Sequence, residues 1–175
     1  TAPATDFVTV TESHPSVTVY DSMSRVISVT APDGTVAATA YGTESLDGVT
    51  RLTTTVTDPL SRARTQFANL RGETVAVREF NTVGGTLRTL VTRYQYDPLG
   101  RLVQVTDALG HPTSADYDSR GLMVSLTNPD TGRTEYRYTL SGDLGAEETP
   151  RLRAIGDVTR YVRTWHRLDR VEVPG

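Results

Sequence analysis

The chain has 175 residues, a formal net charge of −3 and no cysteine, which excludes disulfides and cysteine-based metal sites. This small net charge gives no electrostatic reason to expect nucleic acid or an acidic membrane as a partner, and no apolar run approaches the roughly 18 residues that predict a membrane span. All 18 basic residues are arginine, which pairs with carboxylates bidentately and stacks on aromatic rings.

Stretches with strand-like alternation follow one another along the chain, and helical periodicity is nearly absent. The first such stretches, rich in Val, Thr and Ala, are 7–11, 16–20, 25–30 and 35–41. Residues 133–138 are the clearest strand, with two tyrosines on one face and Arg and Glu side chains on the other. We expect about fourteen antiparallel strands. Only residues 147–156 indicate a loop or a short helical turn.

Turn residues separate these stretches. Asp33-Gly34 and Asp47-Gly48 are strong hairpin signals. Asp58-Pro59 and Asp97-Pro98 start turns through the Asp side chain and the fixed φ of proline. The strands alternate without one wholly apolar face, which favours a single curved layer of hairpins over a packed two-sheet sandwich.

The turns recur with a period of 21 residues, which is typical of a repeat architecture. Tyr96-Asp97-Pro98-Leu99-Gly100-Arg101 is followed by two further copies, which begin at Tyr117 and Tyr138. Tyr20 and Tyr41 are separated by the same step. A second turn in each unit ends on a glycine, so each unit is predicted to contain two strands and two turns. The residues assigned to the repeat signature, in a structural role, are Tyr20, Asp21, Arg25, Gly34, Tyr96, Asp97, Gly100, Arg101, Gly110, Tyr117, Asp118, Gly121, Tyr138, Gly142 and Trp165.

The regularity of the repeats varies along the chain, although we interpret residues 1–175 as one repeat array. Degenerate copies occupy 16–93, the best-defined copies occupy 94–145, and 146–175 contains a loop and the start of a further copy at Trp165. The chain opens on Thr1 and that last copy begins close to its end. We therefore expect both ends to be cuts through a longer protein.

Candidate binding and catalytic residues have structural interpretations that fit the period better. The repeated tyrosines could stack on sugars, but their spacing favours stacking between neighbouring repeats. The repeated aspartates lie one per repeat, which favours turn capping over calcium binding. Interleaved acidic residues favour a cross-strand ladder over a polyanion site for the arginines. The three histidines are scattered and there is no nucleophile elbow, so we predict no catalytic residue, no metal site and no cofactor.

The Tyr-Asp-x-x-Gly-Arg-Leu frame resembles the YD repeat of Rhs proteins, teneurins and the B and C components of bacterial insecticidal toxin complexes. The best matches are 96–102 and 117–122, with the second-half turns at 107–110 and 128–132. The resemblance covers about residues 16–173 and is strongest over 94–145.

This resemblance implies an all-β fold of tandem hairpins that wind in a spiral and form part of a hollow shell. In the bacterial toxins of the family the shell encloses a variable C-terminal toxic domain. The implied function is a structural segment of such a shell in a larger bacterial protein, secreted or at the cell surface. Its partners would be neighbouring repeats and the enclosed toxin or effector domain. The alternative is a cell-surface adhesion or carbohydrate-binding module, with a glycan as partner. The autoproteolytic segment of the family has no match here.

Overall fold

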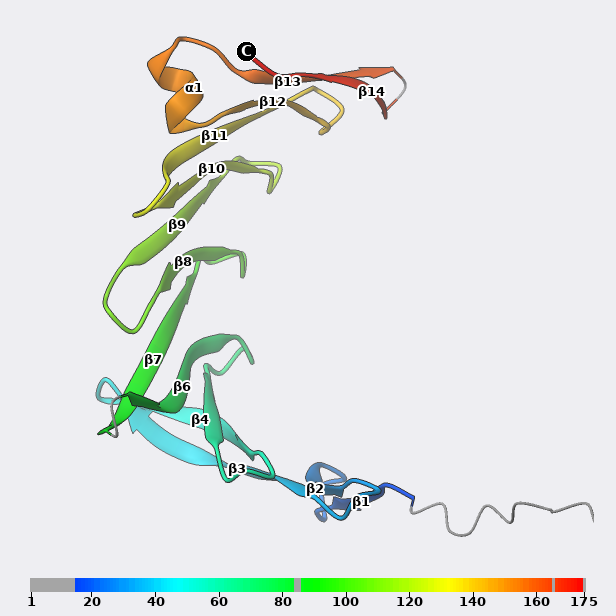
Figure 1. Cartoon of the computed structure of the whole chain (residues 1–175), viewed down its shortest axis with the longest axis vertical. Coiled ribbons are helices and arrows are strands. Elements are labelled where there is room, and N and C mark those ends of the chain that lie inside the picture. Colours follow the sequence, from blue (N-terminus) through cyan, green and yellow to red (C-terminus); the bar gives the residue numbers. More distant parts are fainter. Residues whose placement is uncertain (1–14, 84–85, 165, 175) are drawn as a thin grey trace, which may run out of the picture. The chain divides into compact units, whose positions relative to one another are not determined.

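A computed structural model describes residues 15–83, 86–164 and 166–174. This part of the chain contains fourteen strands and one short helix (Figure 1). The strands of the first half are β1 (Val17–Tyr20), β2 (Val26–Thr30), β3 (Val36–Leu46), β4 (Val49–Thr57), β5 (Ala63–Ala68), β6 (Thr74–Val83) and β7 (Thr86–Tyr96). They are followed by β8 (Leu102–Thr106), β9 (Pro112–Tyr117), β10 (Met123–Asn128), β11 (Gly132–Tyr138), β12 (Leu144–Glu148), α1 (Pro150–Ala154), β13 (Thr159–Thr164) and β14 (Arg167–Glu172).

Each strand is hydrogen-bonded to its neighbours in the sequence, so the strand order is β1 to β14 without a crossover. The assigned pairs are antiparallel, as in β3–β4, where nine successive residues face each other from Ala38↔Thr57 to Leu46↔Val49. The prediction of an all-β array of antiparallel hairpins is confirmed. The predicted strand at 7–11 lies outside the described residues.

The predicted irregular segment 147–156 contains α1, while its first two residues belong to β12. The helix begins where Thr149 caps it: the Thr149 hydroxyl accepts the backbone N–H of Leu152 at 3.3 Å. Pro150 follows in the first turn, where its missing N–H costs nothing. Pro150 also packs against the β10–β11 turn, since a Cβ added at Gly132 would lie 2.8 Å from its Cγ.

Most hairpins of the array share one turn geometry. In the turn at 97–101, the Gly100 N–H donates to the Asp97 carbonyl at 3.0 Å, and the Asp97 N–H donates to the Arg101 carbonyl at 2.9 Å. The fourth residue adopts positive φ, which glycine supplies without steric cost. The same pair of backbone hydrogen bonds closes the turns at 21–25, 31–35, 58–62, 69–73, 107–111, 118–122 and 139–143.

The chain divides into two compact units, Thr1–Leu90 and Val91–Gly175. Most of the buried side chains of the described residues lie in the first unit, where Phe67 and Ala76 are fully buried and Val77 and Thr65 nearly so. Phe67 faces Ala76 across β5 and β6. The Arg78 guanidinium lies 5.1 Å from the centre of the Phe67 ring. Arg78 also forms a bidentate ion pair with Glu44, so it links β6 to β3 across the two strands between them.

In the second unit the register sorts the side chains onto two different faces. Residues paired across antiparallel strands project to the same side of a sheet. One side, the tyrosine face, carries Tyr94, Val105, Thr113, Ala115, Leu126, Thr134, Tyr136, Glu147, Thr159 and Tyr161. The opposite side, the charged face, carries Gln104, Ser114, Asp116, Ser125, Arg133, Glu135, Arg137 and Glu148.

No helix among the described residues is long and apolar enough to cross a membrane.

Candidate functional site

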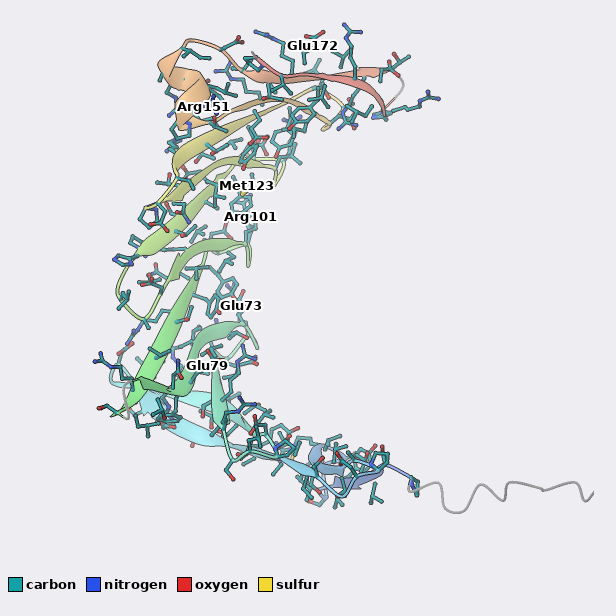
Figure 2. All side chains as sticks on the ribbon, viewed as in Figure 1. Glu73, Glu79, Arg101, Met123, Arg151 and Glu172 are labelled. Atoms are coloured by element: carbon teal, nitrogen blue, oxygen red, sulfur yellow. The ribbon has the colours of Figure 1, made fainter. Side chains whose placement is uncertain are left out.

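The most regular site in the molecule is the contact between one signature turn and the next. We call it the repeat lock and define it by Asp97, Arg101 and Leu102 of one repeat with Tyr117 and Asp118 of the following repeat. Arg101 ends one signature turn and Met123 directly follows the next, and both lie at the same end of the strands of the second unit (Figure 2).

The repeat lock begins inside the turn, at Asp97. Its Oδ1 accepts the backbone N–H groups of Leu99 and Arg101, each at 2.9 Å, and its Oδ2 accepts the Arg101 Nε–H at 2.6 Å. The backbone hydrogen bond from Arg101 is the main reason that the pKa of Asp97 lies below its ordinary value. The same carboxylate therefore both closes the turn and orients the Arg101 side chain.

Arg101, held in this way, reaches the next repeat. Its guanidinium lies 5.0 Å from the centre of the Tyr117 ring, and its NH1 donates to the carbonyl of Asp118 at 3.1 Å. In return, the Tyr117 hydroxyl donates to the carbonyl of Leu102 at 2.9 Å. Each signature thus binds the backbone of its neighbour, which gives the 21-residue period its physical reason.

The same contacts recur in other repeats. The Tyr41 hydroxyl donates to the Val26 carbonyl at 3.2 Å, and the Arg25 guanidinium lies 4.2 Å from the centre of the Tyr41 ring. Further along, the Tyr138 hydroxyl donates to the Met123 carbonyl at 2.8 Å. Burial raises the pKa of Tyr138, as expected for a phenol held between two repeats.

Arg120 shows how a sequence variation is accommodated. In this repeat the arginine precedes the glycine, and Leu122 takes the place where Arg101 stands in the repeat before. Arg120 nevertheless binds Asp118 at 2.9 Å and donates to the Thr139 carbonyl of the next repeat at 3.1 Å. The role is conserved although the position changes, and the sequence analysis did not identify Arg120 in it.

Most of the other assigned signature residues lie in turns of the same kind or at the strand end next to one. Asp21 and Asp118 bind backbone N–H groups two and four residues ahead, as Asp97 does. Tyr20 is 58% exposed on β1 and its hydroxyl has no partner among the described residues. Tyr96 ends β7. Trp165 lies outside the described residues. The assigned glycines with positive φ are Gly34, Gly100, Gly110, Gly121 and Gly142.

A ladder of ion pairs occupies the charged face. Glu148 binds Arg137 at 2.9 Å and Arg153 of α1 at 3.0 Å. Glu135 binds Arg133 at 3.2 Å and Arg153 at 3.4 Å. Arg137, the other strand neighbour of Glu135, extends to β12 and binds Glu148. Arg153 bridges two carboxylates and so fixes α1 to the sheet.

The described residues contain no group of three His, Cys, Asp or Glu side chains that could hold a metal ion. The two described histidines each contact one carboxylate: His111 Nδ1 lies 3.1 Å from Asp107 Oδ2, and His166 contacts Asp143. The repeat lock and the ladder are arrangements that hold strands together.

Comparison with known proteins agrees with this geometry. The family model of the RHS repeat matches residues 85–112, which include the Asp97–Arg101 turn. No curated protein matches the chain.

Solved structures of similar fold include a crystal structure of TcdB2-TccC3-Cdc42 (TM-score 0.67) and one of TcdB2-TccC3 without its hypervariable C-terminal region (0.68). A third is the Photorhabdus luminescens Tc holotoxin pore with the mutation TccC3-D651A (0.64). Each is 21% identical over 89% of this chain, which spans 8% of the length of the matched chain.

Proposed function

We propose that this chain, which matches the RHS-repeat family over residues 85–112, is a wall segment of a β-shell that encloses a toxin or effector domain. The observation that carries the proposal is the repeat lock. Where the repeat lock forms, one repeat binds the backbone of its neighbour, so the sheet can be extended by adding repeats and needs no central core.

The mechanism is sequestration, in which the wall keeps an enclosed polypeptide from proteases and from the cytosol. No side chain needs to react, because the arginine and tyrosine contacts serve to maintain the wall. The likeness to a complex that has a hypervariable C-terminal region supports a variable domain as the enclosed partner. The parent protein would be bacterial, and either secreted or exposed at the cell surface.

The assigned signature residues act in this proposal as structural parts of the wall. The best-defined repeats at 94–145 form its most regular portion, and the degenerate repeats at 16–93 and the segment 146–175 continue it. Their partners are neighbouring repeats. A role in glycan adhesion, the alternative, is disfavoured because the hydroxyls of Tyr41, Tyr117 and Tyr138 are bound to backbone carbonyls.

Limited proteolysis of the full-length protein that contains this sequence tests the proposal. The intact protein is compared with a version that lacks residues 94–145, and the downstream region expressed by itself is the unprotected reference. We expect the downstream region to resist cleavage only in the intact protein. Equal cleavage of that region in all three samples, or a natural protein that has no downstream region, would contradict enclosure.

A further inference from the structure

Glu147 and Glu148 are adjacent in β12 but lie on opposite faces of the sheet, where their surroundings differ. Glu148, on the charged face, binds the guanidinium groups of Arg137 and Arg153. Glu147, on the tyrosine face, forms no ion pair with any described residue, and its one side-chain hydrogen bond comes from the Tyr161 hydroxyl. Although the chain has 18 arginines, none of the described arginines pairs with this half-buried carboxylate.

The groups around Glu147 are aromatic. Tyr136 is its direct partner across β11 and β12, and the Tyr161 hydroxyl donates to its Oε2 at 3.0 Å. Burial, followed by the charge of Glu147, raises the pKa of Tyr136. Burial and the hydrogen bond to Glu147 raise the pKa of Tyr161. Both phenols therefore remain neutral beside the carboxylate, and both side chains lie next to it on the tyrosine face.

A carboxylate beside two tyrosine rings is the chemistry that recognises a cation. The carboxylate supplies the opposite charge, and the ring faces attract an ammonium or guanidinium group through their quadrupoles. Glu147 Oε1 accepts no hydrogen bond from the described residues, so one oxygen is available to such a group. Desolvating a carboxylate without a cationic partner is unfavourable, and a bound cation would remove that penalty.

We infer that Glu147, Tyr136 and Tyr161 form a binding site for a lysine or arginine side chain of a polypeptide that packs on the tyrosine face. Charge complementarity identifies this occupant. No arginine of the described residues fills the site, so the cation comes from another segment or another chain.

An apolar hollow on the same sheet indicates which residues would flank the cation. It has a volume of about 170 Å³ and is lined by strands β8, β9 and β10, with Val105, Ala115 and Leu126 among its residues. The register places these three side chains on the tyrosine face. Side chains alternate along an extended segment, so one that runs across the strands would place a basic residue at Glu147 and an apolar residue a few positions away, on the same side, in or near the hollow.

This inference rests on the proposed function for its biological occupant, which would be the polypeptide behind the wall. The site itself can be tested without that assumption. If the downstream region proves unprotected but the site binds cations, the enclosure is wrong and the site remains. If protection holds and the site does not bind, only this inference fails.

The test uses the full chain and three blocked peptides, acetyl-Leu-Lys-Leu-amide, its norleucine counterpart and its glutamate counterpart. Norleucine keeps the length of the lysine stem and removes the ammonium group. Binding is followed by isothermal titration and by NMR shifts of the tyrosine rings. We expect the lysine peptide to bind about fivefold more tightly than the norleucine peptide, the glutamate peptide to bind worst, and added salt to reduce the preference for lysine.

Variants assign the preference to the site. Glu147→Gln should abolish the preference for lysine over norleucine, whereas Glu172→Gln, at an exposed position on β14, should retain it. Tyr136→Leu should reduce the preference for lysine over norleucine. Tyr136→Phe should retain this preference because the aromatic ring is kept. Equal binding of the three peptides, no binding at all, or a lysine preference that persists in Glu147→Gln would overturn the inference. Circular dichroism of each variant confirms that the sheet is intact.

Discussion

The two units of the chain are held together differently. In the first unit, Phe67 is fully buried against Ala76, and the Arg78–Glu44 pair joins strands that lie 34 residues apart in the sequence. In the second unit, Ser125 is the one described residue that reaches the buried class, and stability comes from repeat locks between successive turns. Near-consensus repeats rely on contacts between neighbours, whereas the first unit adds a small packed core to its own contact between Arg25, Val26 and Tyr41.

The largest expected effect comes from removing the core of the first unit. Phe67→Ala deletes a fully buried ring and should lower the free energy of unfolding by about 3–5 kcal/mol. Hydrogen exchange should locate the loss of protection in β4 to β6. Leu140→Ala, at a fully exposed turn position, is the control and should change little. Equal loss of protection in both units would show that the two do not unfold separately.

The next effect concerns the contact between α1 and the sheet in the second unit. Gly132→Ala places a Cβ 2.8 Å from Pro150 Cγ at a residue with φ of +79°. Gly110→Ala, at φ +91° with no atom within 4 Å, is the matched control and should cost about 1–2 kcal/mol from the backbone alone. In denaturant titrations, Gly132→Ala should lower the free energy of unfolding by more than Gly110→Ala does. Adding Pro150→Ala to Gly132→Ala should restore the difference. Identical costs for the two glycines would refute the close packing of α1.

A smaller effect measures one hydrogen bond of the repeat lock. Tyr117→Phe removes the donor to the Leu102 carbonyl but keeps the ring beside Arg101, and should cost about 0.5–1.5 kcal/mol. Tyr20→Phe is the control, because the Tyr20 hydroxyl has no partner among the described residues. Urea unfolding of both variants is the measurement. If the control loses as much stability as Tyr117→Phe, the hydrogen bond does not hold the repeats together.

The smallest effect is a pH dependence in the second unit. The pKa of Asp97 is lowered in the folded chain, chiefly by the backbone hydrogen bond from Arg101. The ionised carboxylate therefore stabilises the fold at pH values above its ordinary pKa of 3.8. That contribution is lost as the pH falls through the lowered pKa. Asp97→Asn keeps an acceptor for the turn, as Asn69 does naturally, and removes the titration. Urea midpoints measured from neutral to acidic pH should fall less steeply in this variant; parallel curves would exclude the effect.

Local signals in the sequence were enough to predict the strands, the turns and the period. These features are local: a strand needs alternation over a few residues, and a turn such as Asp97–Arg101 needs an aspartate and a glycine within five positions. The interpretation of 147–156 as a loop or short helical turn rested on local signals too, and α1 lies within it.

The contacts between side chains of different strands could not be predicted in this way and emerge from the three-dimensional structure. Arg120 replaces the missing arginine of its repeat from another turn position, and Arg78 reaches Glu44 across two strands. Glu147 and Glu148 receive opposite surroundings because the register of β11, β12 and β13 assigns each to a face. Such contacts depend on register added up over several strands, where bulges such as those at Gln95/Tyr96 and Arg137/Tyr138 shift the pairing. The alternation within one strand does not reveal this cumulative register, so it does not predict these contacts.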